Sequence, residues 1–294
     1  MWQEYLYPET VDEALRLLAE RGGEARVIAG GTDLVLQLQR GERRAASLID
    51  VSRIPALRGI SEGGGFVALG AAATHAQVAS SPLIRAVAPV LAQAAAEMGS
   101  PEIRNVATLG GNIVNAQPAA DTALALLALE AEAEVVDREG ARWLPLADLY
   151  RGAGVSTVDS TAQIVRGFRF PTPGGQVGSA YRRLGKCKSI ALPVLCAAMV
   201  VRLEGERIAS AAISLGPVAP RPFRARAAEA ALVGRPPTAE VIAQAAASAQ
   251  EEARPRDSLL RCDRLYRKDM VAVLVQSTLE RAIASARQPA EEVS

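Results

Sequence analysis

The 294-residue chain is poor in side chains that bind metals, with three cysteines and one histidine. Cys187, Cys196 and Cys262 are far apart and include no CxxC pair, which argues against a zinc site or a four-cysteine iron–sulfur cluster within this chain. Widely spaced cysteines in an odd number fit a reducing environment. We therefore expect a cytoplasmic protein whose own residues hold no metal.

The sequence also lacks an excess of charge of one sign and a long apolar run. Its 33 basic and 32 acidic side chains balance, so no long-range field attracts nucleic acid or an anionic membrane. The longest apolar stretch, residues 191–201, is well short of the roughly 20 residues that a membrane helix needs. The first ten residues show no basic region followed by an apolar one, as a signal peptide would. We expect neither a nucleic-acid partner nor a membrane span.

What the first half of the chain does contain is an alternation of helix and strand patterns. Thr10 and Glu13 form a capping pair at the start of a helix that ends at the glycines 22–23, and a second helix is predicted over residues 81–98. The other predicted elements are strands at 25–29, 48–51, 66–69, 134–137 and 163–170, a helix at 121–130, and a polar, glycine-containing loop at 99–112. This alternation favours an α/β or α+β first domain.

A domain boundary is predicted at residues 171–175, Pro-Thr-Pro-Gly-Gly, which have no apolar periodicity. Beyond it, strands come first and helices follow, which favours a separate α+β domain. The strands are predicted at 179–184, 194–203 and 208–215, and the helices at 224–232, 239–252 and 263–286. We thus predict two domains, residues 1–175 and 176–288.

The sharpest local signals are two glycine loops, Ala29-Gly-Gly-Thr-Asp33 and Thr108-Leu-Gly-Gly-Asn112. Glycines let the backbone approach a ligand closely, successive N–H groups can converge on phosphate oxygens, and Thr or Asn adds a side-chain donor. Two such loops are suited to bind a diphosphate from both sides, although a glycine pair taken alone more often marks only a turn. Neither GxGxxG nor GxxxxGK[ST] fits, which disfavours Rossmann and P-loop sites.

The wider context of these loops resembles a known family, the FAD-binding medium subunits of bacterial molybdenum hydroxylases such as carbon monoxide dehydrogenase and xanthine dehydrogenase. The resemblance covers nearly the whole chain. Its longest part is the run Ile103-Arg-Asn-Val-Ala-Thr-Leu-Gly-Gly-Asn-Ile113, closing on Pro118 and Asp121. Shorter parts are Tyr7-Pro8, Ala29-Gly-Gly-Thr-Asp-Leu34, Ile49-Asp-Val51, Gly70-Ala71, Thr74-His75, Tyr181-Arg-Arg183 and Leu215-Gly-Pro-Val-Ala-Pro220.

The resemblance implies an α+β fold: a two-lobed FAD-binding domain of the vanillyl-alcohol-oxidase (PCMH) type, followed by a small C-terminal domain with an antiparallel sheet and helices. FAD would lie between the lobes. We expect it to be bound non-covalently, because no histidine near the start of the chain offers a covalent attachment point. The chain also lacks the cysteines for the additional iron–sulfur cluster that some family members carry.

The resemblance further implies which residues bind FAD. Residues 27–34 and 108–112 would surround the diphosphate and ribityl chain, and Asp121 would accept a hydrogen bond from FAD hydroxyls. Ile164 or Val165 would lie against the adenine or flavin, and Tyr181 or Arg182 would reach the cofactor from the C-terminal domain. The predicted cofactor-binding residues are Val27, Ile28, Ala29, Gly30, Gly31, Thr32, Asp33, Leu34, Thr74, Thr108, Leu109, Gly110, Gly111, Asn112, Asp121, Ile164, Val165, Tyr181 and Arg182.

Several of these positions have a second interpretation. His75 either has a structural role at a helix start or contacts the flavin. Asp33 is either an Asx cap or a cofactor ligand, and near a diphosphate its carboxylate should point away. Asp121 is also a good helix N-cap.

Three further residues lie outside the predicted set or at its edge. Arg104 pairs either with phosphate or with a carboxylate of the fold. Arg183, like Arg182, belongs either to a solvated strand face or to the site. Cys196 lies in an apolar run and is typical of a core residue.

The resemblance implies an electron-transfer role without substrate chemistry in this chain. Substrate would react at a molybdenum cofactor in a large partner subunit, and electrons would pass through [2Fe-2S] clusters of a small partner subunit to FAD and then to an external acceptor. The whole would be a dimer of heterotrimers. Two alternatives are a stand-alone FAD-dependent oxidase or reductase, which would need a base beside the flavin, and a scaffold without cofactor, which the intact glycine loops argue against.

Overall fold

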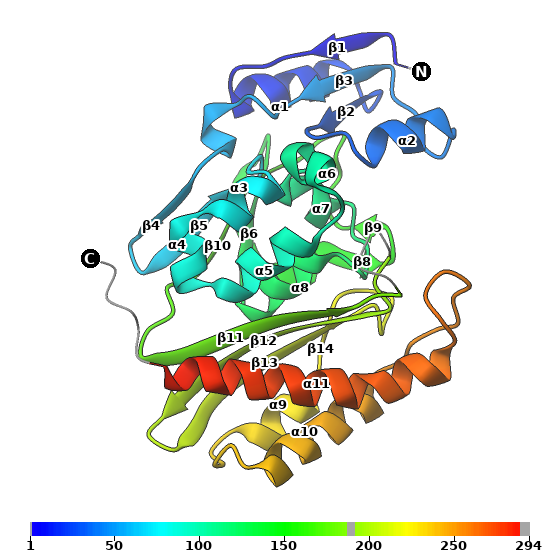
Figure 1. Cartoon of the computed structure of the whole chain (residues 1–294). Coiled ribbons are helices and arrows are strands. Elements are labelled where there is room, and N and C mark those ends of the chain that lie inside the picture. Colours follow the sequence, from blue (N-terminus) through cyan, green and yellow to red (C-terminus); the bar gives the residue numbers. More distant parts are fainter. Residues whose placement is uncertain (1, 187–191, 289–294) are drawn as a thin grey trace.

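The computed structural model describes residues 2–186 and 192–288, and these form three stacked parts (Figure 1). The first part is a three-stranded parallel sheet in the order β1-β3-β2, built from β1 (Glu4–Leu6), β2 (Ala25–Ile28) and β3 (Ser47–Asp50). Two helices accompany it, α1 (Val11–Glu20) and α2 (Leu34–Gln39). The predicted capping of α1 is confirmed, because the Thr10 side chain accepts a hydrogen bond from the Glu13 N–H.

The second part, the middle lobe, is a five-stranded antiparallel sheet in the order β4-β5-β10-β6-β7. Its strands are β4 (Ile60–Gly63), β5 (Phe66–Gly70), β6 (Glu132–Asp137), β7 (Gly140–Pro145) and β10 (Ile164–Pro171). Its helices are α3 (His75–Ser80), α4 (Pro82–Val87), α5 (Pro89–Glu97), α6 (Pro101–Val106), α7 (Leu109–Val114) and α8 (Asp121–Ala128). The 3-10 helices η1 (Pro55–Leu57) and η2 (Leu146–Leu149) and the small pair β8 (Tyr150–Gly152) and β9 (Val155–Ser156) complete it.

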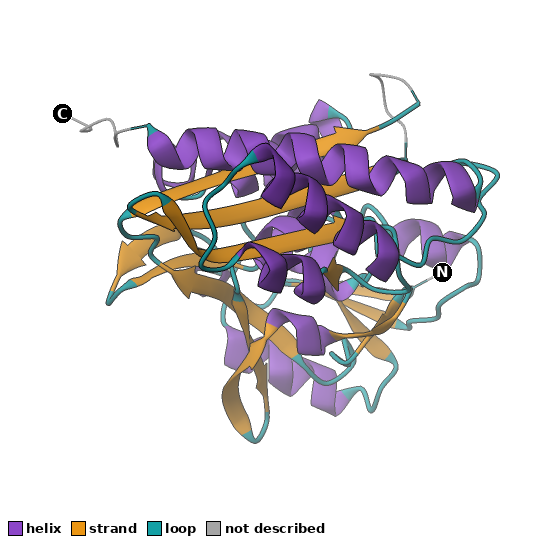
Figure 2. Ribbon diagram, turned by 90° about the horizontal axis from the view of Figure 1, so that it is seen from below, coloured by secondary structure: helices purple, strands orange, loops and turns teal. Residues whose placement is uncertain are grey.

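The third part is a four-stranded antiparallel sheet in the order β11-β12-β13-β14. Its strands are β11 (Gln176–Leu184), β12 (Leu195–Glu204), β13 (Arg207–Gly216) and β14 (Phe223–Arg224). The helices α9 (Arg226–Leu232), α10 (Ala239–Glu252) and α11 (Arg264–Arg287) cover one face, and α5 and α8 of the middle lobe lie on the other (Figures 1 and 2). The α+β fold class, with two lobes followed by an antiparallel sheet and helices, is confirmed.

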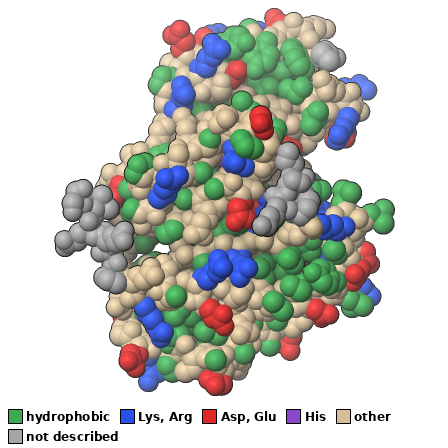
Figure 3. All heavy atoms as spheres, viewed as in Figure 1, with side chains coloured by type: hydrophobic (Ala, Val, Ile, Leu, Met, Phe, Trp, Pro, Cys, Tyr) green, Lys and Arg blue, Asp and Glu red, His purple; other side chains and the backbone are tan. Residues whose placement is uncertain are grey.

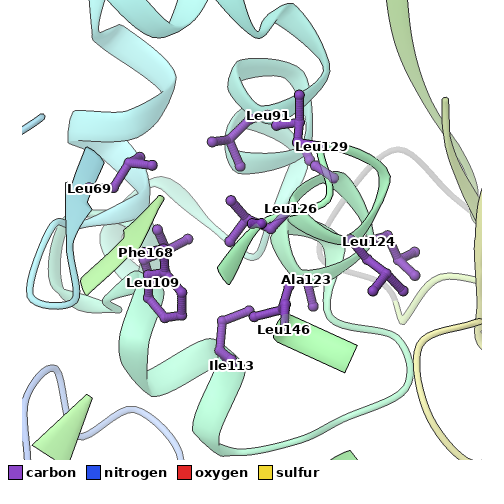
Figure 4. Packing of buried hydrophobic residues seen from close by; sticks show 14 of the residues in the cluster. Leu69, Leu91, Leu109, Ile113, Ala123, Leu124, Leu126, Leu129, Leu146 and Phe168 are labelled. Carbon is purple, nitrogen blue, oxygen red and sulfur yellow. The ribbon is translucent and has the colours of Figure 1, made fainter. Parts of the chain in front are cut away.

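Helix α8 joins the middle lobe to the third part. All its residues are buried, as a helix that is apolar on every side requires. Leu124 and Leu126 belong to the main core, together with Leu109 of α7 and Phe168 of β10 (Figure 4). Each such buried side chain contributes about 1.5–3 kcal/mol by leaving water. The continuous core makes the two parts one packed body.

Two local predictions are wrong. The helix predicted over residues 81–98 is interrupted at Ala88 (φ −142°, ψ 61°), because Pro89 disfavours the helical conformation for the residue before it. The loop predicted over 99–112 contains the helices α6 and α7, whose first turns are capped by the side chains of Ser100 and Thr108. The signal at α6 is the same Ser-Pro pair that marks α4, at residues 100–101.

The sequence patterns also missed several short elements, which are α2, α3, β1, β4, β7, β8, β9, β14 and the two 3-10 helices. Elsewhere the predicted bounds shift by a few residues at the ends. The surface mixes basic and acidic side chains (Figure 3), in agreement with the balanced charge. Within the described residues, no helix has the length and apolar character needed to cross a membrane.

The packing of α11 on the third sheet yields a stability prediction. A Cβ atom on Gly178 of β11 would lie 2.0 Å from the Ala282 carbonyl oxygen and 2.2 Å from the Ala286 nitrogen, both in the backbone of α11. We expect Gly178→Ala to lower the free energy of unfolding by about 1–3 kcal/mol, the usual cost of overpacking, in denaturant titrations.

The matched control is Gly63→Ala in β4, where a Cβ would meet no atom within 4 Å. It should change stability by no more than about 0.5 kcal/mol. Equal losses in the two variants would contradict the proposed close contact between β11 and α11.

Candidate flavin-binding site

The first glycine loop connects β2 to α2 and lies directly against the backbone before the second loop. A Cβ atom on Gly30 would lie 2.0 Å from the Val106 carbonyl oxygen and 2.9 Å from the Ala107 Cα, so no other residue fits here without displacing backbone. Gly31 has φ +69°, a conformation that side chains disfavour. The structure therefore brings the two predicted loops together, as the sequence analysis expected.

The backbone of the first loop is open to a ligand. In the part of the chain that the structure describes, the N–H groups of residues 30–34 form no hydrogen bond with protein atoms. Asp33 occupies the N-cap position of α2, but its side chain caps no N–H group, so the Asx-cap interpretation is wrong. Consecutive unpaired N–H groups are the donors that an anion-binding loop uses.

The second loop uses its N–H groups internally. The N–H groups of Leu109 and Gly110 donate to the carbonyls of Ala73 (2.9 Å) and Ala71 (2.8 Å). The Gly111 N–H donates to the Thr108 hydroxyl at 3.2 Å. Thus Leu109, Gly110 and Gly111 do not offer the converging N–H groups that the sequence suggested.

The second loop instead presents a bare surface. Gly111 is exposed, and a Cβ atom there would meet only the Thr108 hydroxyl oxygen, at 3.2 Å. Thr74 pairs with Thr108 in an isolated antiparallel bridge, and its own hydroxyl caps α3 in a capping box with Gln77. Both threonines therefore have structural roles that need no ligand.

Asp121 is the first residue of α8 and lies at the junction with the third sheet. The N-cap position belongs to Ala120 and no side chain caps there, so the N-cap interpretation of Asp121 is wrong. Its carboxylate accepts hydrogen bonds from the Tyr181 hydroxyl and, at 3.7 Å, from the Cys196 thiol. The Arg183 Nε lies 3.9 Å from the same oxygen.

Burial raises the pKa of Asp121, opposed by the hydrogen bond from Tyr181 and by the charge of Arg183. Burial also raises the pKa of Tyr181. The structure thus brings together two predicted site residues, Asp121 and Tyr181, and adds Cys196 and Arg183 to them. Sequence reasoning assigned Cys196 to the core alone, and no sequence signal connects β12 with α8.

The remaining predicted residues lie in different surroundings. Asn112 accepts a hydrogen bond from the Thr122 hydroxyl at 2.8 Å, which joins α7 to α8. Ile164 packs in the same cluster as Val27 and Ala29 of the first lobe, whereas Val165 belongs to the core of the middle lobe. Alternation along β11 directs Arg182 to the face opposite Tyr181. The structure therefore does not bring Arg182 and Tyr181 to one point.

Two other basic candidates have structural roles. The Arg104 guanidinium donates to the carbonyls of Met98 (3.0 Å) and Gly99 (3.1 Å), so its partners are backbone rather than a carboxylate. His75 is fully buried, and neither ring nitrogen makes a hydrogen bond of normal geometry within the described residues. Burial lowers its pKa to about 4, the nearby Thr108 backbone opposes this, and the charge of Arg104 adds to it. His75 has the structural role.

Two surface pockets lie away from the glycine loops. One of about 530 Å³ lies between α1 and residues 137–138. The other, of about 390 Å³, lies between α5, β11 and α11, and Tyr181 is the one predicted site residue in its lining. The candidate site thus consists of the open backbone of the first loop and the glycine surface of the second, not of either pocket. Cys187 lies outside the described residues.

Comparisons with known proteins decide the family. Residues 2–173 match the family model described as FAD binding domain in molybdopterin dehydrogenase. The chain belongs to this family. Residues 179–282 also match the CO dehydrogenase flavoprotein C-terminal domain.

Similar proteins include several flavin subunits. The chain is 32% identical to the carbon monoxide dehydrogenase medium chain of Hydrogenophaga pseudoflava, over 96% of this chain and 97% of that protein. It is 29% identical to the xanthine dehydrogenase FAD-binding subunit of Escherichia coli O157:H7, over 94% of each. The solved structure of carbon monoxide dehydrogenase from Hydrogenophaga pseudoflava has a chain with TM-score 0.92 and 33% identity, covering 97% of this chain and 98% of that one.

These comparisons confirm the predicted family, the oxidoreductase class and FAD as the family's cofactor. The residues of this flavin subunit fit such a group. Unpaired N–H groups at residues 30–34 suit a diphosphate, and the exposed Gly111 leaves space that a side chain would fill.

The close contact of Gly30 with the backbone before the second loop lets us predict how a substitution at Gly30 affects FAD binding. Gly30→Ala must move the first loop away from Val106 and Ala107, which disturbs the spacing of the N–H groups that follow. We expect FAD affinity to fall at least tenfold, about 1.4 kcal/mol, in titrations followed by flavin fluorescence. Gly152→Ala, where a Cβ would meet nothing within 4 Å, should bind FAD like the wild type. An unchanged affinity in Gly30→Ala would show that the contact is dispensable.

Because His75 is buried, we expect the free energy of unfolding to depend on pH. Its pKa is about 4 in the folded protein and 6.5 when exposed, so the unfolded chain binds the proton more strongly. The contribution of His75 to the free energy of unfolding is therefore fully present above pH 6.5. It falls by about 3 kcal/mol as the pH is lowered to 4.

His75→Gln should remove this part of the pH dependence, so that the difference in unfolding free energy between wild type and variant changes between pH 7 and pH 4. Denaturant titrations at both values measure it. Parallel pH profiles would mean that the pKa of His75 is the same in the folded and unfolded chain.

Proposed function

We propose that this chain is the electron-transfer subunit of a molybdenum hydroxylase complex. FAD, when bound, accepts electrons from [2Fe-2S] clusters of a small partner subunit and passes them to an external acceptor. Substrate would be oxidised at the molybdenum cofactor of a large partner subunit. The residues of this chain bind the cofactor and orient it, since the redox chemistry belongs to the flavin.

The observation that supports the proposal best is the open backbone at residues 30–34, held against Val106 and Ala107. It provides main-chain donors for a diphosphate, and the one titratable side chain among these residues is that of Asp33. The relatives support the same division of labour, because their names describe medium chains or FAD-binding subunits of dehydrogenases.

The alternative, a stand-alone oxidase or reductase, is less well supported. Such an enzyme needs an acid or base within reach of its substrate. His75, the one histidine of the chain, is fully buried with a pKa of about 4. Asp121 is engaged by Tyr181 and Cys196.

Several finer assignments belong to the same proposal. Residues 27–34 and 108–112 would surround the diphosphate and ribityl chain, with Asp121, Ile164 or Val165, Thr74, and Tyr181 or Arg182 completing the contacts. We place the domain boundary between residues 175 and 176, because β10 ends at Pro171 and β11 begins at Gln176 in another sheet. We further propose a cytoplasmic dimer of heterotrimers without a nucleic-acid partner.

The test of cofactor binding uses the second loop. Gly111→Leu places a large side chain on the exposed surface of α7 without a backbone clash, so the fold should survive while FAD affinity falls at least tenfold. Visible absorption of the purified protein and of FAD released by heat measures the loss.

Gly63→Leu in β4, on the opposite side of the middle lobe in Figure 1, is the control and should keep its flavin. Wild-type protein that stays colourless and takes up no added FAD would refute the function proposed here. Flavin that binds but is not reduced when the [2Fe-2S] clusters of the assembled complex are reduced would refute the electron route alone.

A further inference from the structure

Strand β11 is an edge of the third sheet, and its outward backbone groups can be assigned. On β13, the Ile213 carbonyl accepts from the Ala225 N–H, so Ile213 faces away from β12. The direction of the backbone N–H and C=O groups alternates along each strand, and it can be followed through the paired residues from β13 to β12 and on to β11. The N–H and C=O groups of Ala180 therefore point towards β12, and those of Ser179 and Tyr181 point outward. The Tyr181 N–H confirms this assignment, because it donates to the Gln93 side chain at 2.9 Å.

This edge forms the floor of the pocket of about 390 Å³. Pro89, Gln93 and Glu97 of α5 form one wall, and Arg281 and Ser285 of α11 form the other. Figure 1 shows α5 above β11 and α11 below it. We call this space the β11 groove. No residue of either glycine loop lines it.

The floor of the β11 groove has backbone groups without partners. Within residues 2–186 and 192–288, the Ser179 N–H and C=O groups and the Tyr181 C=O group make no hydrogen bond. Ser179 and Tyr181 are both buried, and buried backbone groups are nearly always paired in native structures. The pattern of unpaired donor and acceptor along an extended strand is the pattern that another strand satisfies.

The Gln93 side chain already imitates part of such a strand. Its amide oxygen accepts from the Tyr181 N–H, in the place that the carbonyl of an added strand would take. Beside it, the Ser179 hydroxyl accepts from the Val90 N–H at the start of α5. Helix α5 is therefore fixed along the edge strand, but the Ser179 backbone between the two helices stays open.

We propose that the β11 groove receives an extended segment of a partner subunit, which adds as a strand to the edge of β11. Its acidic side chain lies on the α11 side, towards Arg281 and away from Glu97 of α5. Strand addition draws its affinity from main-chain hydrogen bonds and its specificity from flanking side chains, and the groove offers both. The inference goes beyond the proposed function and rests on it only for the existence of partner subunits. The competing explanation is that α5 and α11 merely shield an edge strand from aggregation.

The test compares the flavin subunit alone with the complex that it forms with co-expressed molybdenum and [2Fe-2S] subunits. Hydrogen exchange read at the Ser179 amide should slow at least tenfold on assembly, whereas the Tyr181 amide, already bonded to Gln93, should change less. Exchange at Ser179 that is equal in the two states would overturn the proposal and leave the shielding explanation.

A pair of variants gives an independent measurement. Ser285→Trp fills the β11 groove and should weaken association with the partner subunits at least tenfold, measured by native mass spectrometry of the purified complex. Ala284→Trp adds the same side chain at the neighbouring exposed position of α11, outside the groove, and should assemble normally. Both variants should retain the FAD content of the wild type.

Assembly of Ser285→Trp at wild-type strength would overturn the proposal. If the wild-type subunit associates with no partner subunit, the proposed function fails and the groove proposal fails with it. If it associates while Ser179 stays unprotected, the groove proposal fails alone.

Discussion

The structure depends on close backbone approach at positions where a side chain is missing. Gly30 brings the first lobe against the carbonyl of Val106 in the middle lobe, and a Cβ on Gly216 would lie 2.4 Å from the Pro118 carbonyl oxygen, where β13 meets the middle lobe. Gly178 does the same between the third sheet and α11. Because backbone cannot yield as a side-chain end can, the contacts of Gly30 and Gly216 fix how the three parts sit together, and that of Gly178 fixes α11 on its own sheet. The Gly30 contact also sets the geometry of the candidate site.

Buried charge fixes the junction between the middle lobe and the third sheet in a second way. Arg224 of β14 reaches the Leu127 carbonyl at the end of α8 (2.9 Å) and pairs with Glu229, which also accepts from the Ile213 N–H (2.8 Å). At the other end of the same helix, Asp121 accepts a hydrogen bond from the Tyr181 hydroxyl. Charged groups that are taken out of water stabilise a fold only when their partners are well placed. Helix α8 is thus tied to the third sheet at both of its ends.

Periodicity predicted the three helices of the third part, α9, α10 and α11, because it depends only on residues close together in the chain. The choice of α+β over α/β, and the roles of the two glycine loops around one cofactor, came from the resemblance to a family. The sequence analysis failed where the structure depends on contacts between segments that are far apart in the chain. The internal use of the Gly110 N–H depends on pairing with Ala71, and the partners of Asp121 come from β11 and β12. The interruption at Pro89 was readable locally and was missed, since the apolar pattern continues across it.

The candidate site is built mainly from backbone groups, which explains why few of its side chains can take part in proton transfer. The N–H groups of residues 30–34 do not titrate, so their ability to donate to a diphosphate does not depend on pH. The titratable group of this loop is the carboxyl of Asp33, whose pKa is raised by burial. His75 and Asp121 are also buried, with pKa values shifted towards their neutral forms. All three shifts favour the neutral form of the side chain, which suits the electron-transfer role proposed above, in which substrate would react on a partner subunit.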